Sequence, residues 1–437
     1  MEKIDQLIHA NTLITCEDNN QILTDHAIAV KDGKILAILP SKSAAEKYEC
    51  ANISHFNSHV ILPGFINCHT HLAMNVFRGL ADDLNLMDWL NNHIWPAEAE
   101  WVSPEMVYDG SQMAMAEMIR CGTTCFNDMY FFLHETATAA IEAGLRANIG
   151  ITIIDIPTPW AKTTDEYFSK GRTFYDKYQK HPLVTPTMAP HSPYMVSLEN
   201  LIRVNELAQE LDLKINIHLH EDPAEIEQSM KLYNQRPLER LQAINMISDR
   251  LIAVHMTQIN QADMNILSAT RPNIVHCPES NMKLNSGQCP VQQLLNAGLN
   301  VSLATDGAAS NNDLDMVGEM RSAALLGKIT ADDPRAANAE TVLKMATLYG
   351  ARTLGLDQVT GSLTPGKSAD FIAINLDEIE TQPLYHPISQ IVYAASRHQV
   401  TDVWCAGKRL LKARELQTLD ERELLNKAKT WRKKIKN

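Results

Sequence analysis

Eight short apolar runs, separated by helical patterns, constrain the fold more than any other feature of this sequence. They occupy residues 63–69, 122–129, 147–155, 183–191, 214–220, 251–256, 272–278 and 300–306. Strands that alternate with helices are typical of parallel βαβ units, and eight consecutive units favour a closed (β/α)8 barrel of the TIM type. We therefore predict an α/β fold in which residues 59–365 form a single barrel domain.

The segments on either side of the barrel have a different pattern, with short alternating strands and tight turns. Residues 1–58 contain such strands on both sides of Asp32-Gly33, a dipeptide that favours a hairpin turn. The pattern returns in residues 366–437, which end in a charged helix. We expect the two terminal segments to join in one small β-sandwich domain beside the barrel, and the last helix to be a solvated tail.

Polar side chains stand at the carboxyl ends of most of the eight runs, where the active sites of TIM-type barrels lie. His69 and His71 close the first run, and side chains two positions apart on a strand point the same way. Two neutral imidazoles on one side of a strand supply half of a tetrahedral metal site. The pair is weak evidence by itself, because the chain has 16 histidines.

Three further runs end in groups that would complete such a site. The fifth run ends in His218 and His220, which share a face, so spacing leaves both as candidates for a third ligand. Glu221 follows them at the rim, His255 closes the sixth run, and Asp306 ends the eighth. A carboxylate in that place can bind a metal and accept a proton from water. We hypothesise a single-metal centre that activates water.

Composition argues against several other classes of protein. The net charge of −13 is unlike the basic character of proteins that bind duplex nucleic acid. No run approaches the ~18 consecutive apolar residues that would span a membrane, and the first residues lack the pattern of a secretory signal. The eight cysteines form no C-x-x-C pair, which suits a reduced cytoplasm. We expect a cytoplasmic protein with neither nucleic-acid nor membrane partners.

Together with the residues around them, these groups resemble the amidohydrolase superfamily, and more closely its bacterial 5-methylthioadenosine/S-adenosylhomocysteine deaminases. The likeness extends over essentially the whole chain. It rests on PGFINCHTHLAMNVFRG (63–79), WLNNHIWPAEA (89–99), GTTCFNDM (122–129), APHSPYMVS (189–197), INIHLHED (215–222), HCPESNMKL (276–284), LATDGAASNNDLDM (303–316) and GSLTPGKSAD (361–370).

The resemblance implies a role for each candidate at the strand ends. His218, rather than His220, would be the third histidine ligand. Glu221 would shuttle protons, and His255 would hydrogen-bond the attacking water and steady the tetrahedral intermediate. Three histidines and an aspartate favour one Zn2+ per subunit, with Fe2+ or Mn2+ as alternatives. The full set of metal ligands would be His69, His71, His218 and Asp306.

The resemblance also identifies residues that would contact the substrate, with Glu221 and Asp306 acting on the purine. Glu98 would accept the ribose hydroxyls, because an ionised carboxylate can take two hydroxyl protons, and His191 would be a second contact to the nucleoside. Some family members carry an arginine after the third strand for the homocysteine carboxylate, whereas this chain has IDIPTPWAKTTDE there. Aromatics that could line an apolar 5′ pocket, but more commonly pack in a core, are Phe131, Phe132 and Trp160.

The expected reaction is hydrolytic deamination of an adenine nucleoside: 5′-methylthioadenosine, S-adenosylhomocysteine or adenosine. Asp306 would take a proton from water, and Glu221 would protonate ring N1 and then the leaving amine, so that ammonia is released. The zinc site of cytidine deaminases is different, because it needs H-x-E with P-C-x-x-C. Alternatives are deamination of a free purine (guanine or 8-oxoguanine), s-triazine hydrolysis, and a non-catalytic barrel scaffold. We also expect a homo-oligomer.

Overall fold

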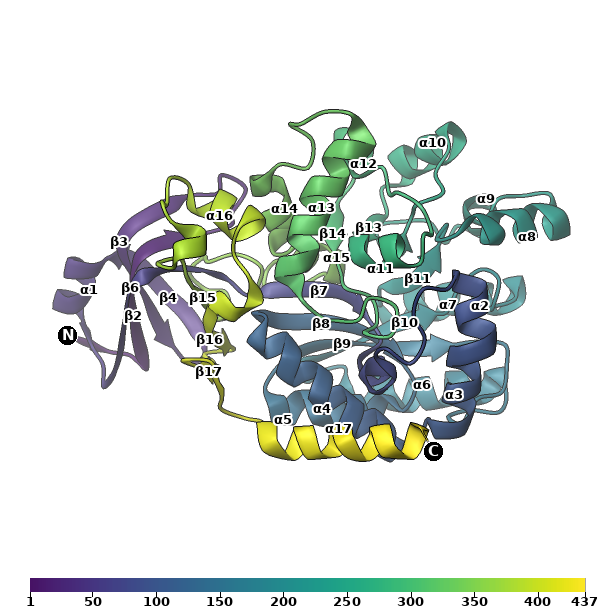
Figure 1. The fold of residues 1–437 in the computed structure, drawn as a ribbon, viewed down its shortest axis with the longest axis horizontal. Helices are drawn as coiled ribbons and strands as arrows, with labels where there is room; N and C mark the ends of the chain where they lie inside the picture. The colour runs from purple at the N-terminus through teal and green to yellow at the C-terminus, as the bar shows by residue number, and fades with distance from the viewer. Residues whose placement is uncertain (437) are drawn as a thin grey trace.

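Eight parallel strands form the central sheet of the computed structural model, which describes residues 1–436 (Figure 1). Each strand lies within one of the eight predicted runs or extends one residue beyond it at one end, and the order of the strands in the sheet is their order along the chain. Most are buried over their whole length, since helices cover the outside of the sheet and side chains fill its inside. The strands are β7 (Phe65–Thr70), β8 (Thr123–Tyr130), β9 (Arg146–Ile153), β10 (Val184–Pro190), β11 (Ile215–Leu219), β12 (Leu251–His255), β13 (Asn273–His276) and β14 (Val301–Leu303).

The sheet closes at a seam between β7 and the segment that follows β14. Nδ2 of Asn67 donates to Oγ1 of Thr305 at 2.8 Å, and the Thr305 N–H donates to Oδ1 of Asn67 at 3.1 Å. The Asp306 N–H donates to the His69 carbonyl at 3.1 Å. The first and last strands therefore meet, and the predicted TIM-type barrel is confirmed.

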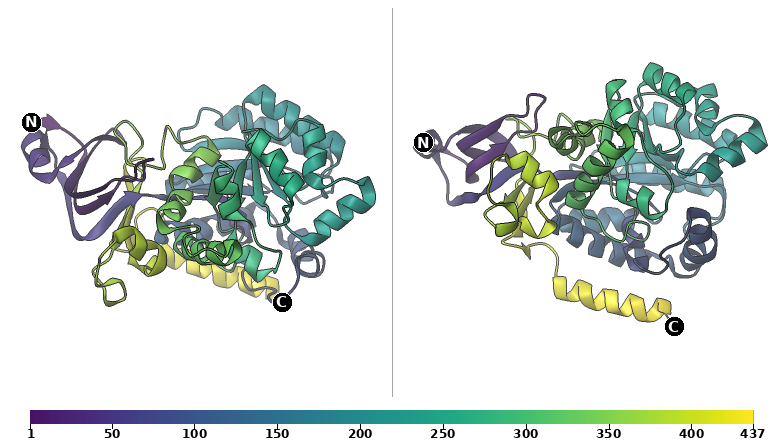
Figure 2. Two further views of the ribbon diagram at one scale, coloured as in Figure 1. Left: turned by 90° about the horizontal axis from the view of Figure 1, so that it is seen from above. Right: turned by 45° about the horizontal axis from the view of Figure 1, so that its top comes forward.

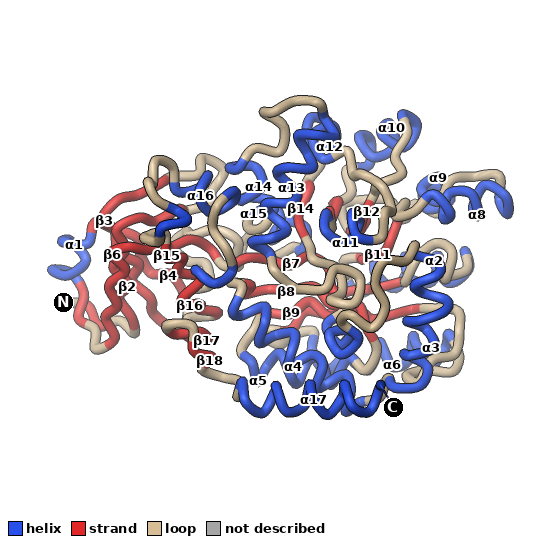
Figure 3. The backbone as a smooth tube through the Cα atoms, viewed as in Figure 1, coloured by secondary structure: helices blue, strands red, loops and turns tan. Residues whose placement is uncertain are grey.

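Helices connect the strands and form the outer layer of the barrel (Figure 3). Several begin at a residue whose side chain accepts a hydrogen bond from the first turn, as Ser103, Thr163 and Ser197 do. The outer helices are α4 (Pro104–Arg120), α5 (Leu133–Ala143), α6 (Thr164–Tyr178), α7 (Leu198–Leu211), α8 (Pro223–Tyr233), α9 (Pro237–Ala243), α10 (Gln261–Thr270), α11 (Pro278–Lys283), α12 (Val291–Asn296), α13 (Met316–Ala331), α14 (Ala339–Met345) and α15 (Leu348–Leu354).

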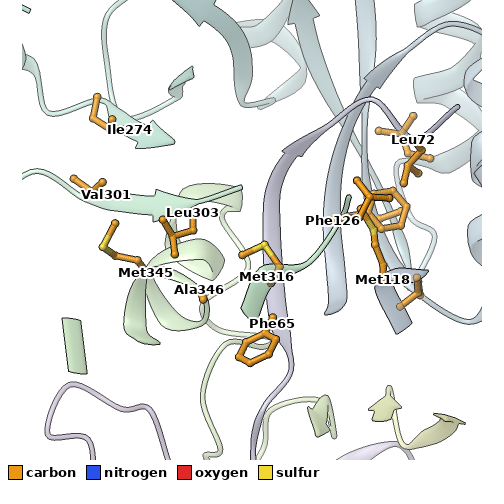
Figure 4. Packing of buried hydrophobic residues seen from close by; sticks show 14 of the residues in the cluster. Phe65, Leu72, Met118, Phe126, Ile274, Val301, Leu303, Met316, Met345 and Ala346 are labelled. Carbon is orange, nitrogen blue, oxygen red and sulfur yellow. The ribbon is translucent and has the colours of Figure 1, made fainter. Parts of the chain in front are cut away.

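The main hydrophobic core lies between the barrel strands and these helices (Figure 4). Phe65 on β7 and Phe126 on β8 are fully buried there, as is Leu303 on β14. Met118 of α4 and Met345 of α14 fill the space between helices and strands. This packing fixes the strand ends, and with them the side chains that those ends carry.

Strands from both ends of the chain form a second eight-stranded sheet at one end of the molecule (Figures 1 and 2). The two segments join where β6 pairs antiparallel with β15, with Phe371 opposite Pro63. The predicted hairpin is confirmed, because Asp32 and Gly33 both adopt positive φ between β3 and β4. The strands are β2 (Gln6–Ile14), β3 (Ile22–Lys31), β4 (Lys34–Pro40), β6 (Asn52–Pro63), β15 (Phe371–Asn375), β16 (Val400–Cys405), β17 (Lys408–Lys412) and β18 (Glu415–Leu416).

The terminal sheet is tied to the barrel by strand continuity and by buried charge. β6 continues to Pro63, so the boundary expected at residue 58 falls inside a strand of the terminal sheet. At the start of β9, Arg146 pairs with Asp370 of the terminal domain at 3.1 Å, and both side chains are buried. The remaining short elements here are β1 (Glu2–Lys3), β5 (Tyr48–Glu49), α1 (Ser41–Lys47) and α16 (Pro387–Tyr393).

Two further pieces complete the barrel domain. Between β7 and α4 lies a helical segment made of α2 (Leu86–Trp89), a π-helix (Leu90–Ile94) and α3 (Trp95–Trp101); we refer to residues 86–101 as the cap. The final helix, α17 (Glu421–Lys436), runs along α4 rather than projecting into solvent, and it buries Leu424 and Trp431 (Figure 1). Within residues 1–436, no helix combines the length and apolar character needed to cross a membrane.

Candidate metal centre and substrate cavity

Four predicted ligands converge at the carboxyl ends of three barrel strands. His69 and His71 come from the end of β7, His218 from β11, and Asp306 from the loop after β14. One ligand atom from each of the four lies within 4.8 Å of all the others. Nε2 of His218 is 3.1 Å from Nε2 of His69 and 3.3 Å from Nε2 of His71. Such a concentration of imidazole nitrogens around one carboxylate suits a bound divalent cation.

The two imidazoles at the outer side of the group are oriented by backbone carbonyls. Nδ1 of His71 is 2.6 Å from the Met129 carbonyl, and Nδ1 of His218 is 2.8 Å from the His191 carbonyl. A carbonyl oxygen can only accept, so Nδ1 carries the proton in both rings. Nε2 is therefore left as a lone-pair donor that points at the centre.

The third imidazole has a side-chain partner. Nδ1 of His69 faces the amide of Asn216 at 3.1 Å, and the Asn216 oxygen has no other partner among the described residues. Turning the amide by 180° brings that oxygen against Nδ1–H without changing the packing. In this arrangement Nε2 of His69 is also free to bind a metal, as in the other two rings.

Asp306 is held by hydroxyl groups on one oxygen and faces the histidines with the other. Ser280 and Ser310 donate to Oδ2 at 2.7 and 2.6 Å, whereas Oδ1 lies 3.2 Å from Nε2 of His71. Burial alone would raise the pKa of Asp306, but the imidazoles of His69 and His71 beside it outweigh this effect and hold the pKa well below its usual range. Its φ of +61° is strained for a non-glycine residue, as is often seen at functional sites.

Glu221 and His255 face each other across the centre. Oε1 of Glu221 is 3.8 Å from Nε2 of His255, and both side chains are buried. Nδ1 of His255 donates to Oδ1 of Asn281 at 2.9 Å, which leaves Nε2 as an acceptor toward the site. Burial, reinforced by Asp306 and Asp222, raises the pKa of Glu221 to about 8. Glu221 thus carries a proton at neutral pH and can donate it.

These groups lie at the base of a cavity of about 300 Å3 that the cap covers on one side. Glu98 of α3 reaches into it, and its Oε1 accepts a hydrogen bond from the Tyr130 hydroxyl at 2.7 Å. His191, after β10, lines the opposite wall, and burial lowers its pKa to about 3, so it is neutral. Apolar side chains form much of the remaining wall: Leu86, Trp89, Leu90, Ile94, Trp95, Phe131, Ile154, Ile156 and Leu284.

The structure shows which candidates for the third histidine ligand and for the aromatic wall of the 5′ pocket lie at the site and which do not. His220 does not face the centre. Its positive φ turns the side chain away from the metal ligands, and its Nε2 accepts a hydrogen bond from the Leu238 N–H at 3.1 Å. Of the three aromatics considered for the 5′ pocket, only Phe131 lines the cavity. Trp160 is buried in the main core, and Phe132 packs against that core.

Sequence reasoning assigned no role to several residues that position the site. Asn216 and Asn281 orient histidines, and Tyr130 contacts Glu98. Asn216 and Asn281 lie in the motifs that carry the family resemblance and Tyr130 directly follows one, but their partners are far away along the chain. For Tyr130 and Asn216 the available signal was a polar side chain within an apolar strand, and Asn281, on α11, had no such signal.

Comparison with known proteins gives a consistent result. The model of the amidohydrolase family matches residues 60–410. A protein of Teredinibacter turnerae named 5-methylthioadenosine/S-adenosylhomocysteine deaminase is 43% identical over 432 residues, which are 99% of this chain and 98% of that protein. A relative of the same name from Aquifex aeolicus is 41% identical over 435 residues, covering 100% of this chain and 98% of its own length.

Solved structures extend the comparison. An adenosine deaminase from Xanthomonas campestris, crystallised with bound zinc, is 46% identical with a TM-score of 0.98, over 100% of this chain and 99% of that one. Atrazine chlorohydrolase from Arthrobacter aurescens, complexed with zinc, reaches a TM-score of 0.91 at 21% identity, over 98% and 99% of the two chains. At that identity the likeness supports the fold alone.

Proposed function

The chain belongs to the amidohydrolase family, and from this premise we propose that it is a metal-dependent deaminase of adenine nucleosides. It would replace the 6-amino group by oxygen and release ammonia, acting on 5′-methylthioadenosine, S-adenosylhomocysteine and adenosine. As an aminohydrolase it acts on carbon–nitrogen bonds other than peptide bonds. The observation that carries the proposal is the convergence of a metal-ligand group and the buried side chain of Glu221 at the base of a cavity that also holds Glu98.

The resident metal in this proposal is one zinc ion per subunit, held by the four-residue group. Three imidazoles with free Nε2 atoms and one carboxylate suit Zn2+, and the similar Xanthomonas campestris protein contains zinc. Fe2+ and Mn2+ accept the same donors and are the alternatives. When bound, such an ion lowers the pKa of water toward neutrality and so supplies hydroxide.

The protein side chains would then manage the protons. Asp306, ionised and fixed by two serines, is placed to accept a proton from the attacking water. Glu221 would give its proton to ring N1 as oxygen adds to C6. It would then take the remaining proton from the new C6 hydroxyl and pass it to the amine as the C6–N bond breaks and ammonia leaves. The proton held by Asp306 would finally restore Glu221. His255, with Nε2 free, would accept a hydrogen bond from the water and hold it on the line of attack.

The other end of the cavity favours a nucleoside over a free base. One oxygen of the Glu98 carboxylate accepts a hydrogen bond from Tyr130, and the second accepts none from the described residues, so it can accept ribose hydroxyls. Neutral His191 offers a further polar contact on the facing wall. Deamination of free purines and s-triazine hydrolysis gain no support beyond the shared fold, and no ligand is missing as a scaffold would require. A cytoplasmic homo-oligomer stays a prediction.

The test is to incubate the zinc-loaded protein with 5′-methylthioadenosine and to measure ammonia together with the change in purine absorbance. We expect turnover by the native chain and a fall in kcat of roughly 10²–10⁴ for Glu221→Gln, which removes the proton donor. The variant Glu227→Gln changes an exposed residue of α8, the helix that follows Glu221, and should retain full activity. Release of ammonia from guanine but not from any adenosine-type nucleoside would overturn the proposal.

A further inference from the structure

Tyr130 is the residue through which the barrel contacts the side chain of Glu98. It is the last residue of β8, it is 4% exposed, and its ring lines the substrate cavity. Its backbone carbonyl accepts a hydrogen bond from Oγ1 of Thr152 at 2.7 Å, which fixes the strand end against β9. Burial and the neighbouring Glu98 raise the pKa of Tyr130 well above its ordinary value, so the hydroxyl keeps its proton and donates.

Glu98 itself comes from a different element. It lies on α3 of the cap, which a π-helix joins to α2 and which is followed by α4. A glutamate side chain has three rotatable bonds, and the only hydrogen bond to this carboxylate from the described chain is that of Tyr130, at 2.7 Å. Without it, no polar contact would fix the rotation of the carboxylate.

We propose that Tyr130 is a positioning residue for ribose recognition, because its hydroxyl holds Oε1 of Glu98 and so presents Oε2 to the 2′ and 3′ hydroxyls of the nucleoside. This inference rests on the proposed function. The hydrogen bond has two effects: it preorganises the acceptor, which lowers the entropic cost of binding, and it stabilises the ionised carboxylate that the ribose hydroxyls need. Tyr130 would act on binding through Glu98 and would take no part in the chemistry at C6.

The experiment compares the native chain and Tyr130→Phe on three substrates: 5′-methylthioadenosine, its 2′-deoxy analogue and its 3′-deoxy analogue. For Tyr130→Phe we expect KM for the parent nucleoside to rise roughly tenfold, as for loss of one hydrogen bond to a charged group, with kcat nearly unchanged. In the native chain, removal of a ribose hydroxyl should raise KM. In the variant, the same removal should have a much smaller effect, because the acceptor is no longer oriented.

The chain offers a matched control in Tyr108→Phe. Tyr108 also donates from its hydroxyl to a glutamate, Glu142, at 2.5 Å, but this pair joins α4 to α5 and Tyr108 does not line the cavity. The control should leave all three KM values as they are in the native chain. Because each variant is compared with itself on different substrates, a small loss of folded protein cancels from the ratios.

The outcomes separate the inference from the proposed function. If the native chain does not deaminate 5′-methylthioadenosine, the proposed function fails, and this inference fails with it. If the native chain is active but Tyr130→Phe loses the same factor on all three nucleosides, or loses kcat instead of raising KM, then Tyr130 has a structural or chemical role and the inference alone is wrong.

Discussion

At the scale of single residues, the site depends on side chains that decide which nitrogen of each histidine faces the metal. Backbone carbonyls do this for His71 and His218, at 2.6 and 2.8 Å. Only His69 relies on a side chain, that of Asn216 on β11. A ligand whose outer partner is a side chain can be altered by mutation without disturbing the strand.

We expect Asn216→Ala to weaken zinc binding by about 10–100-fold, because Nδ1 of His69 loses the partner that fixes its tautomer. Competition with a chelator measures this affinity directly and does not depend on turnover. The variant Asn216→Asp keeps an acceptor for Nδ1–H and should retain the affinity of the native chain. Zinc affinity that is unchanged in Asn216→Ala would show that the contact at 3.1 Å has no role in ligation.

The protonation of Glu98 predicts how substrate affinity depends on pH. Burial raises the pKa of Glu98 to about 7, although Tyr130 and His71 oppose the shift. Below that pH the carboxyl is neutral and loses acceptor capacity, so KM for 5′-methylthioadenosine should rise by up to about tenfold per pH unit. Above it, KM should be constant. Steady-state kinetics across this range check the prediction, and an inflection of equal size for the 2′,3′-dideoxy analogue would contradict it.

The sequence predicted the residues that lie at strand ends better than the residues whose interaction partners are far away along the chain. The strand ends predicted His69, His71 and Asp306 by position, and the structure brings them together. The two-residue spacing of His218 and His220 could not show which of them binds the metal, because it places both side chains on one face of a strand. That rule applies only where the chain is extended. The strand ends at Leu219 and the φ of His220 is +52°, so the following residue turns back toward the site. A single dihedral angle decided the question, and no spacing rule reports it.

At the scale of elements, the eight predicted runs became eight strands because each run is apolar on both faces, which only a covered parallel sheet satisfies. The cap was not predicted. Its π-helix has no distinctive pattern, and its apolar residues face a cavity and a neighbouring helix rather than one core. The predicted domain boundary at residue 58 precedes the end of β6 at Pro63, because no turn signal marks where the chain leaves the terminal sheet for the barrel.

The terminal helix is expected to support the cap. Trp431 of α17 belongs to the same hydrophobic cluster as Trp89, Leu90 and Ile94, all of which line the cavity. It is 4% exposed, and its Nε1 donates to Oδ2 of Asp109 on α4 at 2.9 Å. Removing this ring leaves a void in the cluster to which the cap residues belong, at a cost of roughly 3–5 kcal/mol to local packing.

We therefore expect Trp431→Ala to increase hydrogen exchange in residues 86–101 and to raise KM more than it lowers kcat. Hydrogen-exchange mass spectrometry with parallel kinetics provides the measurement. Arg432→Ala changes the adjacent exposed residue and should leave both unaffected. If hydrogen exchange in the cap is the same in Trp431→Ala as in the native chain, then α17 stabilises α4 and not the cap.

At the scale of the whole molecule, the distribution of charge bears on substrate choice. The chain carries a net charge of −13, and no lysine or arginine is present among the residues that line the cavity. After β9, where the family resemblance implies an arginine in some members, the wall consists of Ile156, Pro157, Thr158 and Pro159. An apolar methylthio group is compatible with this wall, whereas the carboxylate of a homocysteine group finds no cation there.

Accordingly, kcat/KM for 5′-methylthioadenosine should exceed that for S-adenosylhomocysteine by roughly tenfold or more, which corresponds to one unpaired charged group. The variant Thr158→Arg introduces a cation and should lower the ratio of the two kcat/KM values by raising kcat/KM for S-adenosylhomocysteine. The variant Thr158→Gln introduces a long but neutral side chain and should leave the ratio unchanged. If the native chain has equal kcat/KM values for 5′-methylthioadenosine and S-adenosylhomocysteine, the homocysteine carboxylate lies in solvent and does not contact this wall.

The seam of the barrel also has a consequence for how the enzyme matures. His69 and His71 lie on one side of it and Asp306 on the other, and the two sides meet through Asn67, Thr305 and the Asp306 N–H. During synthesis the histidines leave the ribosome long before the aspartate does, so a nascent or truncated chain has only part of the coordination set. Tight metal capture would then report that the barrel has closed, and an incomplete chain would remain inactive and free of its ion.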